Sequence, residues 1–250
     1  MDSSSPQCDL EGHAGSNYGK ILAQIHATLR PRNYFEIGTR DGGTLALARC
    51  DAIAVDPAFV IADPGILSTR RMSLLYQMTS DDFFARFDPR NLFGEPVQFA
   101  FLDGMHRCEF LLRDFYNTEA ACAPNSVIAI HDCLPVELPM TARTEEGIVP
   151  VRPSRTGWWT GDVWRTALLL KTVRPDLEIL ALDSAPTGLL LVTNLDPGSS
   201  FLKDNYNALR REMLSYDLRQ IGIERLFEQL QVVSTSEIDS DEKMTARFWL

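Results

Sequence analysis

Short apolar runs and amphipathic stretches alternate along most of the chain. Residues 20–31, KILAQIHATLRP, have apolar positions at helical spacing and end at a proline, which predicts an amphipathic helix. The run NYFEI at 33–37 predicts a strand, and a glycine-rich turn separates it from a second helical stretch, TLALARC at 44–50. The run AIAVD at 52–56 predicts the next strand. The order of these segments predicts a βαβ unit.

The alternation continues beyond this unit. Further strands are expected at 73–76, 98–102 and 126–130, and helices at 81–87 and 106–122. Near the end, LEILAL at 177–182 and LLLVTNL at 189–195 are separated by too few residues for a parallel crossover, so we expect an antiparallel hairpin. The predicted fold class is therefore α/β, with a doubly wound, mostly parallel seven-stranded sheet that ends in this hairpin.

No internal repeat or low-complexity linker divides the chain, so a single domain over residues 1–250 is expected. Residues 1–15 are polar and predict a flexible leader, and residues 16–195 contain the core fold. Residues 196–250 predict a helical C-terminal extension, with a weak point at Gly222 and a solvated acidic run, SEIDSDE, at 236–242. The amphipathic helices of this extension could also support a homo-oligomer.

The charge balance narrows the possible partners. The chain carries a formal net charge of −10, which disfavours nucleic acid and anionic membranes. No apolar stretch is long enough for a membrane span and the N-terminal residues are polar, so a cytoplasmic protein is expected. The five cysteines include no CxxC pair, which argues against a disulfide framework and a structural zinc site.

A glycine-rich loop follows the first strand, at the position where open α/β sheets bind ligands. Its sequence from Glu36 is EIGTRDGG, with glycines at positions 38, 42 and 43. A dinucleotide fingerprint starting at Gly38 would need glycine at position 40, where Arg40 stands instead. A nicotinamide oxidoreductase is therefore disfavoured.

The loop and the acid Asp56 after the second strand together resemble the class I S-adenosylmethionine-dependent methyltransferases, which have a Rossmann-like fold. The resemblance implies that the loop passes against the methionine part of S-adenosylmethionine and that Asp56 accepts hydrogen bonds from its ribose. It also implies that residues after the third strand contact the adenine. The cofactor-binding residues expected on this basis are Glu36, Gly38, Thr39, Gly42, Gly43, Asp56, Ser80, Asp81 and Asp103.

Two aspartates follow neighbouring strands of the predicted sheet. Asp103 lies in FLDGMH and Asp132 in IHDCLP, so the two carboxylates should face each other across the crevice and could bind a cation. His106, three residues after Asp103, should project toward the same place as a candidate general base.

The spacing of DGxH and HD, with GDVWR at 161–165, is similar to a subgroup containing cephalosporin-hydroxylase-like proteins and magnesium-dependent macrolide sugar O-methyltransferases. This resemblance implies Mg²⁺, or Mn²⁺, held by Asp103 and Asp132. In that subgroup the residue before the second aspartate is acidic, whereas here it is His131. His131 could face away, favour a softer metal, act as a base itself, or indicate a metal-free site. Glu109 and Glu137 are nearby candidates for a third ligand.

The sequence therefore predicts an enzyme that methylates a hydroxyl of a small molecule, such as a sugar or a secondary metabolite. One alternative is a metal-independent N- or O-methyltransferase with His106 or His131 as base. Another is a catalytically inactive module that keeps the cofactor fold. Three tryptophans at positions 158, 159 and 164 could stack on a substrate ring, although aromatic residues at helical spacing more often fill the core.

Overall fold

The structure is a computed structural model that describes residues 7–250. Its strands are β1 (Gly15–Asn17), β2 (Asn33–Ile37), β3 (Asp51–Val55), β4 (Ser73–Tyr76), β5 (Val97–Leu102), β6 (Cys122–His131), β7 (Glu178–Leu182), β8 (Ser184–Ala185) and β9 (Leu189–Thr193). Its α-helices are α1 (Tyr18–Leu29), α2 (Ser80–Phe84), α3 (Pro89–Phe93), α4 (Cys108–Ala121), α5 (Trp164–Val173), α6 (Phe201–Asp204), α7 (Tyr206–Ser215), α8 (Leu218–Ile221), α9 (Ile223–Leu230) and α10 (Asp241–Arg247). Five 3-10 helices complete the described part: η1 (Leu45–Leu47), η2 (Pro64–Thr69), η3 (Pro139–Thr141), η4 (Pro153–Arg155) and η5 (Thr235–Ile238).

Seven strands form one sheet in the order β4-β3-β2-β5-β6-β9-β7. Strands β2 to β6 pair in parallel, and β9 runs antiparallel to both of its neighbours, β6 and β7. The short connection between β7 and β9 leaves no room for a crossover helix, so these two strands must be antiparallel. The predicted fold class, a mostly parallel seven-stranded sheet ending in an antiparallel hairpin, is confirmed.

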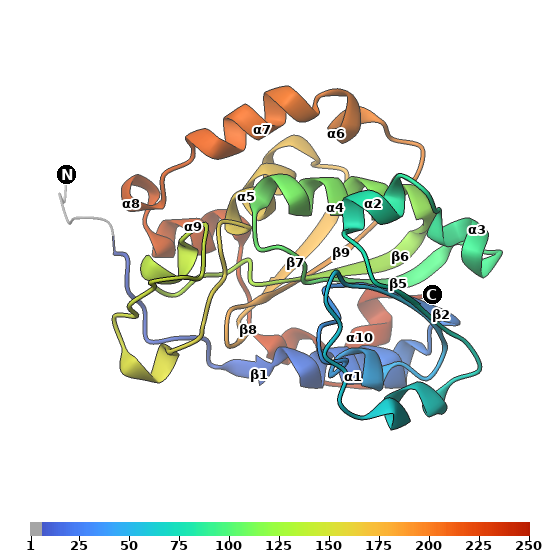
Figure 1. The fold of residues 1–250 in the computed structure, drawn as a ribbon. Helices are drawn as coiled ribbons and strands as arrows, with labels where there is room; N and C mark the ends of the chain where they lie inside the picture. The colour runs from blue at the N-terminus through green and yellow to red at the C-terminus, as the bar shows by residue number, and fades with distance from the viewer. Residues whose placement is uncertain (1–6) are drawn as a thin grey trace.

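Helices cover both faces of the sheet, as Figure 1 shows, with α4, α5 and α7 above it and α1 and α10 below. Side chains of β5 alternate between two apolar clusters: Leu102 packs into the upper cluster and Phe101 into the lower one. Burial on both faces explains why the strands are nearly continuous apolar runs in the sequence. Because β2, β3, β4, β5 and β6 are parallel, their carboxyl ends lie at one edge of the sheet.

The helix expected at 44–50 is wrong, because only the single turn η1 forms there. The chain between β2 and β3 must first make the glycine turn, where Gly42 has a φ of +82°. The residues left before Asp51 are too few for a full helix. The Arg70 guanidinium instead donates a hydrogen bond of 2.7 Å to the Leu45 carbonyl and closes this short turn.

The two ends of the chain are more ordered than expected. Residues 1–6 of the predicted flexible leader lie outside the described residues, but Leu10 donates a backbone hydrogen bond of 2.8 Å to Val136, so residues 7–15 do not form a free leader. The acidic run at 236–242 is not simply solvated, because Ile238 is fully buried and α10 packs against α1. The expected break at Gly222 is confirmed, since α8 ends just before it and α9 begins just after it.

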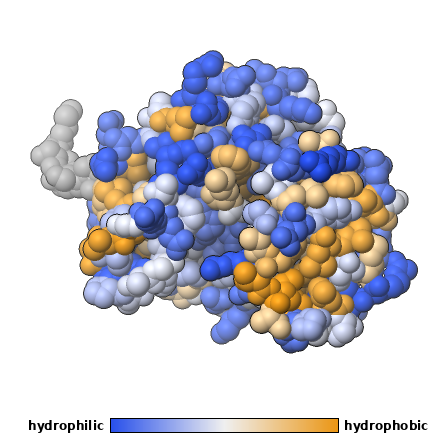
Figure 2. Space-filling model, in the orientation of Figure 1, coloured by the Kyte–Doolittle hydropathy of each residue, from blue (hydrophilic) through white to orange (hydrophobic). Residues whose placement is uncertain are grey.

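Polar side chains cover most of the visible surface in Figure 2, while apolar ones gather at its lower right, where Figure 1 shows the segment after β3. Val60 in that segment is 58% exposed. Among the described residues, no helix combines the length and the apolar character that a membrane crossing requires.

Candidate active site

A cleft of about 890 Å³ opens at the carboxyl ends of the parallel strands. The loops after β2, β3, β4 and β5 line it, together with the start of α1 and part of the segment between β6 and α5. Seven of the nine predicted cofactor residues line this cleft: Gly38, Thr39, Gly43, Asp56, Ser80, Asp81 and Asp103. The other two, Glu36 and Gly42, do not, and their prediction as ligand-contacting residues is not supported by this geometry.

Gly38 and Gly42 shape the loop after β2. A Cβ on Gly38, whose φ is +87°, would lie 1.9 Å from the carbonyl oxygen of Asp103. A Cβ on Gly42 would lie 2.3 Å from the Ile66 side chain. Both positions therefore require glycine, for close backbone approach at Gly38 and for a positive φ at both.

Glu36 lies beneath this loop rather than in the cleft. Its side chain is fully buried and accepts a hydrogen bond of 2.5 Å from the Tyr34 hydroxyl. Burial raises the pKa of Glu36 to about 7, although the Tyr34 hydroxyl acts in the opposite direction. Glu36 therefore supports the loop from below.

Asp56 directly follows β3, and the backbone holds its carboxylate. The N–H of Arg40 donates to one oxygen at 2.8 Å and the N–H of Ala58 donates to the other at 2.7 Å. Each carboxylate oxygen can accept further hydrogen bonds, and Asp56 lines the cleft. Asp56 is thus a fixed acceptor for hydroxyl groups of a ligand.

Residues after β4 form the far end of the cleft. Asp81 accepts hydrogen bonds of 2.7 and 2.6 Å from the Arg113 guanidinium, which fixes its carboxylate at the start of α2. Ser80 lines the cleft beside it. The cleft wall here is polar and held in place by a paired charge.

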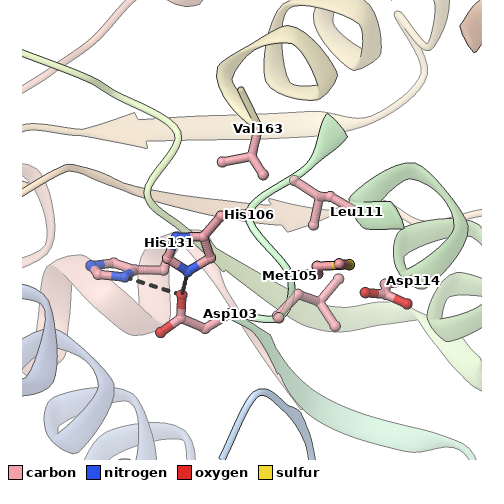
Figure 3. A pocket seen from close by; sticks show the side chains of 9 residues that line it. Asp103, Met105, His106, Leu111, Asp114, His131 and Val163 are labelled. Carbon is pink, nitrogen blue, oxygen red and sulfur yellow. Dashed lines mark ion pairs between the residues drawn. The ribbon is translucent and has the colours of Figure 1, made fainter. Parts of the chain in front are cut away.

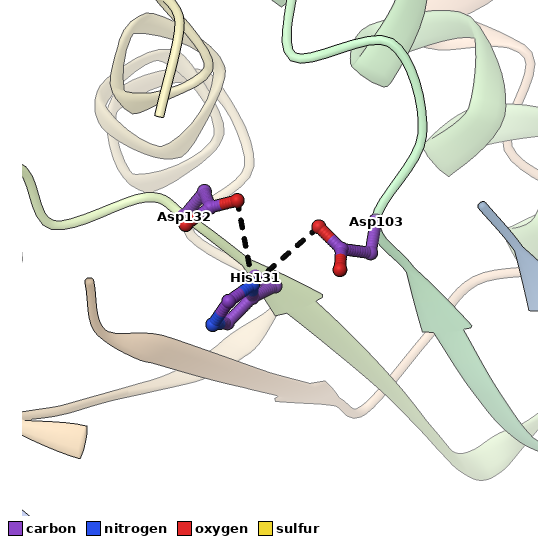
Figure 4. A group of neighbouring side chains, drawn as sticks. All are labelled: Asp103, His131 and Asp132. Carbon is purple, nitrogen blue, oxygen red and sulfur yellow. Dashed lines mark ion pairs between the residues drawn. The ribbon is translucent and has the colours of Figure 1, made fainter. Parts of the chain in front are cut away.

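The aspartates after β5 and β6 face one another, as predicted, and His131 lies between them (Figure 4). Nδ1 of His131 is 3.4 Å from Oδ1 of Asp103 and 3.3 Å from Oδ2 of Asp132. The three residues thus converge with donor atoms within 4.8 Å of one another. The possibility that His131 faces away is excluded by this geometry.

His106 approaches the same two carboxylates from the other side. Its Nε2 is 3.3 Å from Oδ1 of Asp103 and 3.2 Å from Oδ2 of Asp132, and Figure 3 shows both imidazoles joined to Asp103. The sequence predicted that His106 is the first residue of the helix. In the structure His106 precedes α4, and its φ is +45°. The carbonyl of Trp159 lies 2.8 Å from Nδ1 and fixes the ring.

Neighbouring charges determine the protonation of this centre. Burial by itself lowers the pKa of both imidazoles, but Asp103 and Asp132 outweigh it and raise the pKa of His106 to about 9 and that of His131 to about 10. Burial raises the pKa of Asp103, but the nearby His131 and His106 outweigh it and hold it below its usual range. The two carboxylates thus stabilise positive charge at this centre.

Neither nearby candidate for a third ligand groups with Asp103, His131 and Asp132. Glu109 pairs with Arg143 at 2.5 Å, and Glu137 pairs with Arg155 at 2.6 Å, both away from the centre. Arg143 also bridges to Asp162, so the buried group of Cys108, Glu109 and Asp162 already contains a cation. None of the cysteines forms a disulfide in the described part of the chain.

Two aromatic residues line the cleft near this centre, and of these only Tyr18 had no signal in the sequence. The ring of Tyr18 lies 3.9 Å from that of His131, centroid to centroid, and Tyr18 lines the cleft. Trp159 also lines the cleft, with its indole N–H donating to Ala142 at 2.6 Å, whereas Trp164 is 1% exposed and belongs to the core. Of the three tryptophans considered for stacking, Trp159 therefore lies in the cleft and Trp164 does not.

Comparison with known proteins agrees with this architecture. Residues 13–133 match the model of a family described as a methyltransferase domain. No curated protein matches the chain.

Solved structures of similar fold include the SAH-bound methyltransferase PaMTH1 of Podospora anserina, with a TM-score of 0.51 and 10% identity over 72% of this chain and 78% of that one. The O-methyltransferase TomG of Streptomyces achromogenes, involved in tomaymycin synthesis and solved with SAM, has a TM-score of 0.48 and 15% identity, with coverages of 70% and 78%. An O-methyltransferase of Bacillus cereus solved with SAH has a TM-score of 0.45 and 15% identity, with coverages of 70% and 79%. The family match over residues 13–133 and the sheet order agree with a methyltransferase domain of the class I fold.

Proposed function

We propose that this chain, a methyltransferase of the class I fold, transfers the methyl group of S-adenosylmethionine to a hydroxyl of a small molecule with the assistance of a divalent metal ion. The observation that carries this proposal is the position of Asp103. Its side chain belongs to the carboxylate and imidazole centre, and the residue also lines the cleft that contains the glycine loop and Asp56.

The cofactor would occupy the end of the cleft between β2 and β4. The backbone at Gly38 and Thr39 would lie against its methionine part, and Asp56 would accept hydrogen bonds from the ribose hydroxyls. Ser80 and Asp81 would contact the adenine. Asp103 lines the same cleft and would connect this cofactor site to the centre.

The centre would prepare the acceptor. Asp103 and Asp132 would hold the ion, and a divalent ion there would supply polarisation of a bound hydroxyl, which would lower the pKa of that hydroxyl. The positive charge of the ion would lower the pKa of His106 again and leave Nε2 unprotonated. His106 would then take the hydroxyl proton on Nε2, with its ring held by the Trp159 carbonyl. The hydroxyl oxygen then forms a bond to the methyl carbon as the carbon–sulfur bond breaks, and S-adenosylhomocysteine leaves.

The acceptor end of the cleft favours a ring that carries hydroxyl groups and no negative charge. Tyr18, Phe110 and Trp159 offer aromatic faces, and Glu145 adds a carboxylate. Among the lining residues the only arginine or lysine is Arg40, which lies on the glycine loop. A sugar or a hydroxylated secondary metabolite fits these surroundings, whereas a phosphorylated acceptor would meet repulsion.

Transfer of labelled methyl groups tests the proposal. Chelator-treated protein is incubated with S-adenosylmethionine labelled in its methyl group and a panel of neutral sugars and phenolic glycosides, with and without Mg²⁺ or Mn²⁺. We expect labelled ether products only with metal, and none with Asp103→Asn. The variant Asp51→Asn removes a carboxylate paired with the exposed Arg71 and serves as the matched control. Full transfer after chelation would support the metal-independent alternative, and labelled amines would indicate N-methylation.

A further inference from the structure

We propose that the centre binds an imidazole-accepting divalent transition metal, such as Fe²⁺, Co²⁺ or Zn²⁺, in preference to Mg²⁺, with His131 as a ligand beside Asp103 and Asp132. The inference rests on the proposed function, since it concerns the ion that would assist methyl transfer. It follows from four features of His131: its contacts, its orientation, its burial and its chemistry.

Nδ1 of His131 and one oxygen of each aspartate lie at separations typical of three ligand atoms of one metal ion. Nδ1 is 3.3–3.4 Å from one oxygen of each carboxylate, longer than the ~2.7–2.9 Å of a charge-assisted hydrogen bond. Neither Nδ1 nor Oδ1 of Asp103 has a hydrogen-bond partner, although both atoms are buried. Donor atoms on one ion with bonds of ~2.0–2.2 Å lie roughly 3–3.5 Å apart, which matches these separations.

The orientation of the ring leaves Nδ1 available. On the opposite side of the ring, Nε2 lies 3.4 Å from the Thr187 hydroxyl, which in turn donates a hydrogen bond to Oδ1 of Asp132. Because that hydroxyl gives its proton to Asp132, it can only accept from the imidazole, so Nε2 carries a hydrogen. Nδ1 is therefore the nitrogen that would release its proton and face an ion. A second partner that fixes the ring in this way is typical of histidine ligands to metals.

Packing holds the ring in this position. His131 is 7% exposed, and Tyr18 lies across its face with ring centroids 3.9 Å apart. A side chain so confined cannot turn Nδ1 toward water. Its placement costs no reorganisation when an ion enters.

The chemistry of the donor set decides which ion fits. Mg²⁺ prefers oxygen ligands and keeps several waters, whereas imidazole nitrogen is a common ligand of zinc, iron, nickel and copper. In a neighbouring group of buried carboxylates, an arginine side chain supplies the positive charge. Glu109 and Asp162 are each 2.5 Å from the Arg143 guanidinium. The centre of Asp103, His131 and Asp132 has no arginine or lysine among its ion-pair partners in the described part of the chain.

Cobalt provides a direct spectroscopic test. Chelator-treated protein is titrated with Co²⁺ and followed by visible absorption, and with Mn²⁺ followed by electron spin resonance, each in competition with Mg²⁺. We expect Co²⁺ to bind at least about 10-fold more tightly than Mg²⁺, and the pulsed resonance spectrum of the Mn²⁺ form to show coupling to a ¹⁴N nucleus. His131→Glu should remove this nitrogen coupling and bring the two affinities together. His26→Gln, which changes a histidine on α1, should behave as wild type.

The outcomes separate this inference from the proposed function. If the wild-type protein binds S-adenosylhomocysteine but takes Mg²⁺ as tightly as Co²⁺, or shows no nitrogen coupling, the inference about His131 is wrong and the methyltransferase proposal is unaffected. If S-adenosylhomocysteine does not bind to the folded protein, the proposed function fails whatever the metal titration shows. Circular dichroism of His131→Glu establishes that it is folded.

Discussion

The backbone of Gly38 lies directly against that of Asp103, so that a Cβ on the glycine would be 1.9 Å from the aspartate carbonyl oxygen. Gly38 belongs to the loop after β2, and Asp103 follows the adjacent strand β5. This contact couples the proposed cofactor loop to the proposed reaction centre. A side chain added at Gly38 must therefore displace the backbone at Asp103.

Gly38→Ala tests this coupling. The added methyl group would meet backbone atoms that cannot move aside, and the φ of +87° adds a cost for any side chain. We expect a loss of about 3 kcal/mol or more in the free energy of unfolding, measured by urea denaturation. Gly94→Ala is the matched control, because its φ is +74° but nothing lies within 4 Å of the added Cβ. It should lose only about 1 kcal/mol, and equal losses in the two variants would contradict the role of the contact.

Asp114 should make the stability depend on pH. Burial raises its pKa to about 7 from an ordinary 3.8, against the effect of a hydrogen bond with Ser80. The folded state therefore keeps a proton that the unfolded state releases, so the stability of the wild type should fall as the pH rises from 4 to 7. Asp114→Asn lacks this ionisation and should gain about 1–3 kcal/mol relative to wild type between pH 5 and pH 8. If the free energies of unfolding of Asp114→Asn and wild type differed by the same amount at pH 5 and at pH 8, this account would be contradicted.

Arg143 should hold the segment between β6 and α5 against the cleft. Its guanidinium joins Glu109 on α4 to Asp162 at the end of that segment, with both distances 2.5 Å. Arg143→Met should leave these carboxylates without their cation and speed limited proteolysis within residues 141–160 by at least several-fold, while S-adenosylhomocysteine binds as before. Arg152→Met, which breaks an exposed pair with Asp9, is the control. Unchanged proteolysis in Arg143→Met would show that the ion pairs do not restrain the segment.

His106 and His131 should affect different steps. His106→Ala should lower the rate of methyl transfer by about 10²-fold or more with little change in metal or S-adenosylhomocysteine affinity, because it removes the proton acceptor. His131→Ala should weaken metal binding as well. If His131→Ala alone were damaging and His106→Ala were nearly silent, the base would be His131.

The sheet could be predicted from sequence because its strands are buried on both faces. Every residue of β2 and of β9 is buried, and most of these residues are apolar, although Asn33 and Glu36 interrupt the run in β2. The glycine loop, Asp56 and the pair of aspartates could be placed because each follows such a run. The prediction of a helix after Gly43 was wrong because hydrophobic periodicity does not show how many residues the preceding turn requires.

The place of His131 could not be predicted from strand periodicity. Successive residues of a strand point to opposite faces of the sheet, so His131 and Asp132 should diverge. Asp132 has a φ of +60°, however, which turns its carboxylate back toward the imidazole. Tyr18 was equally hidden, because only the paired register of β1 with β8 brings the start of α1 to the cleft.

The central claim is that the cleft binds S-adenosylmethionine through Asp56. Calorimetric titration with S-adenosylhomocysteine tests it most directly on wild type, Asp56→Asn and the surface control Asp51→Asn. We predict one site per chain in the wild type and in Asp51→Asn, and affinity reduced at least about 10-fold in Asp56→Asn, since a hydrogen bond to a charged group contributes ~1.5–3 kcal/mol. Absence of binding to folded wild-type protein, or equal binding by Asp56→Asn, would contradict the account.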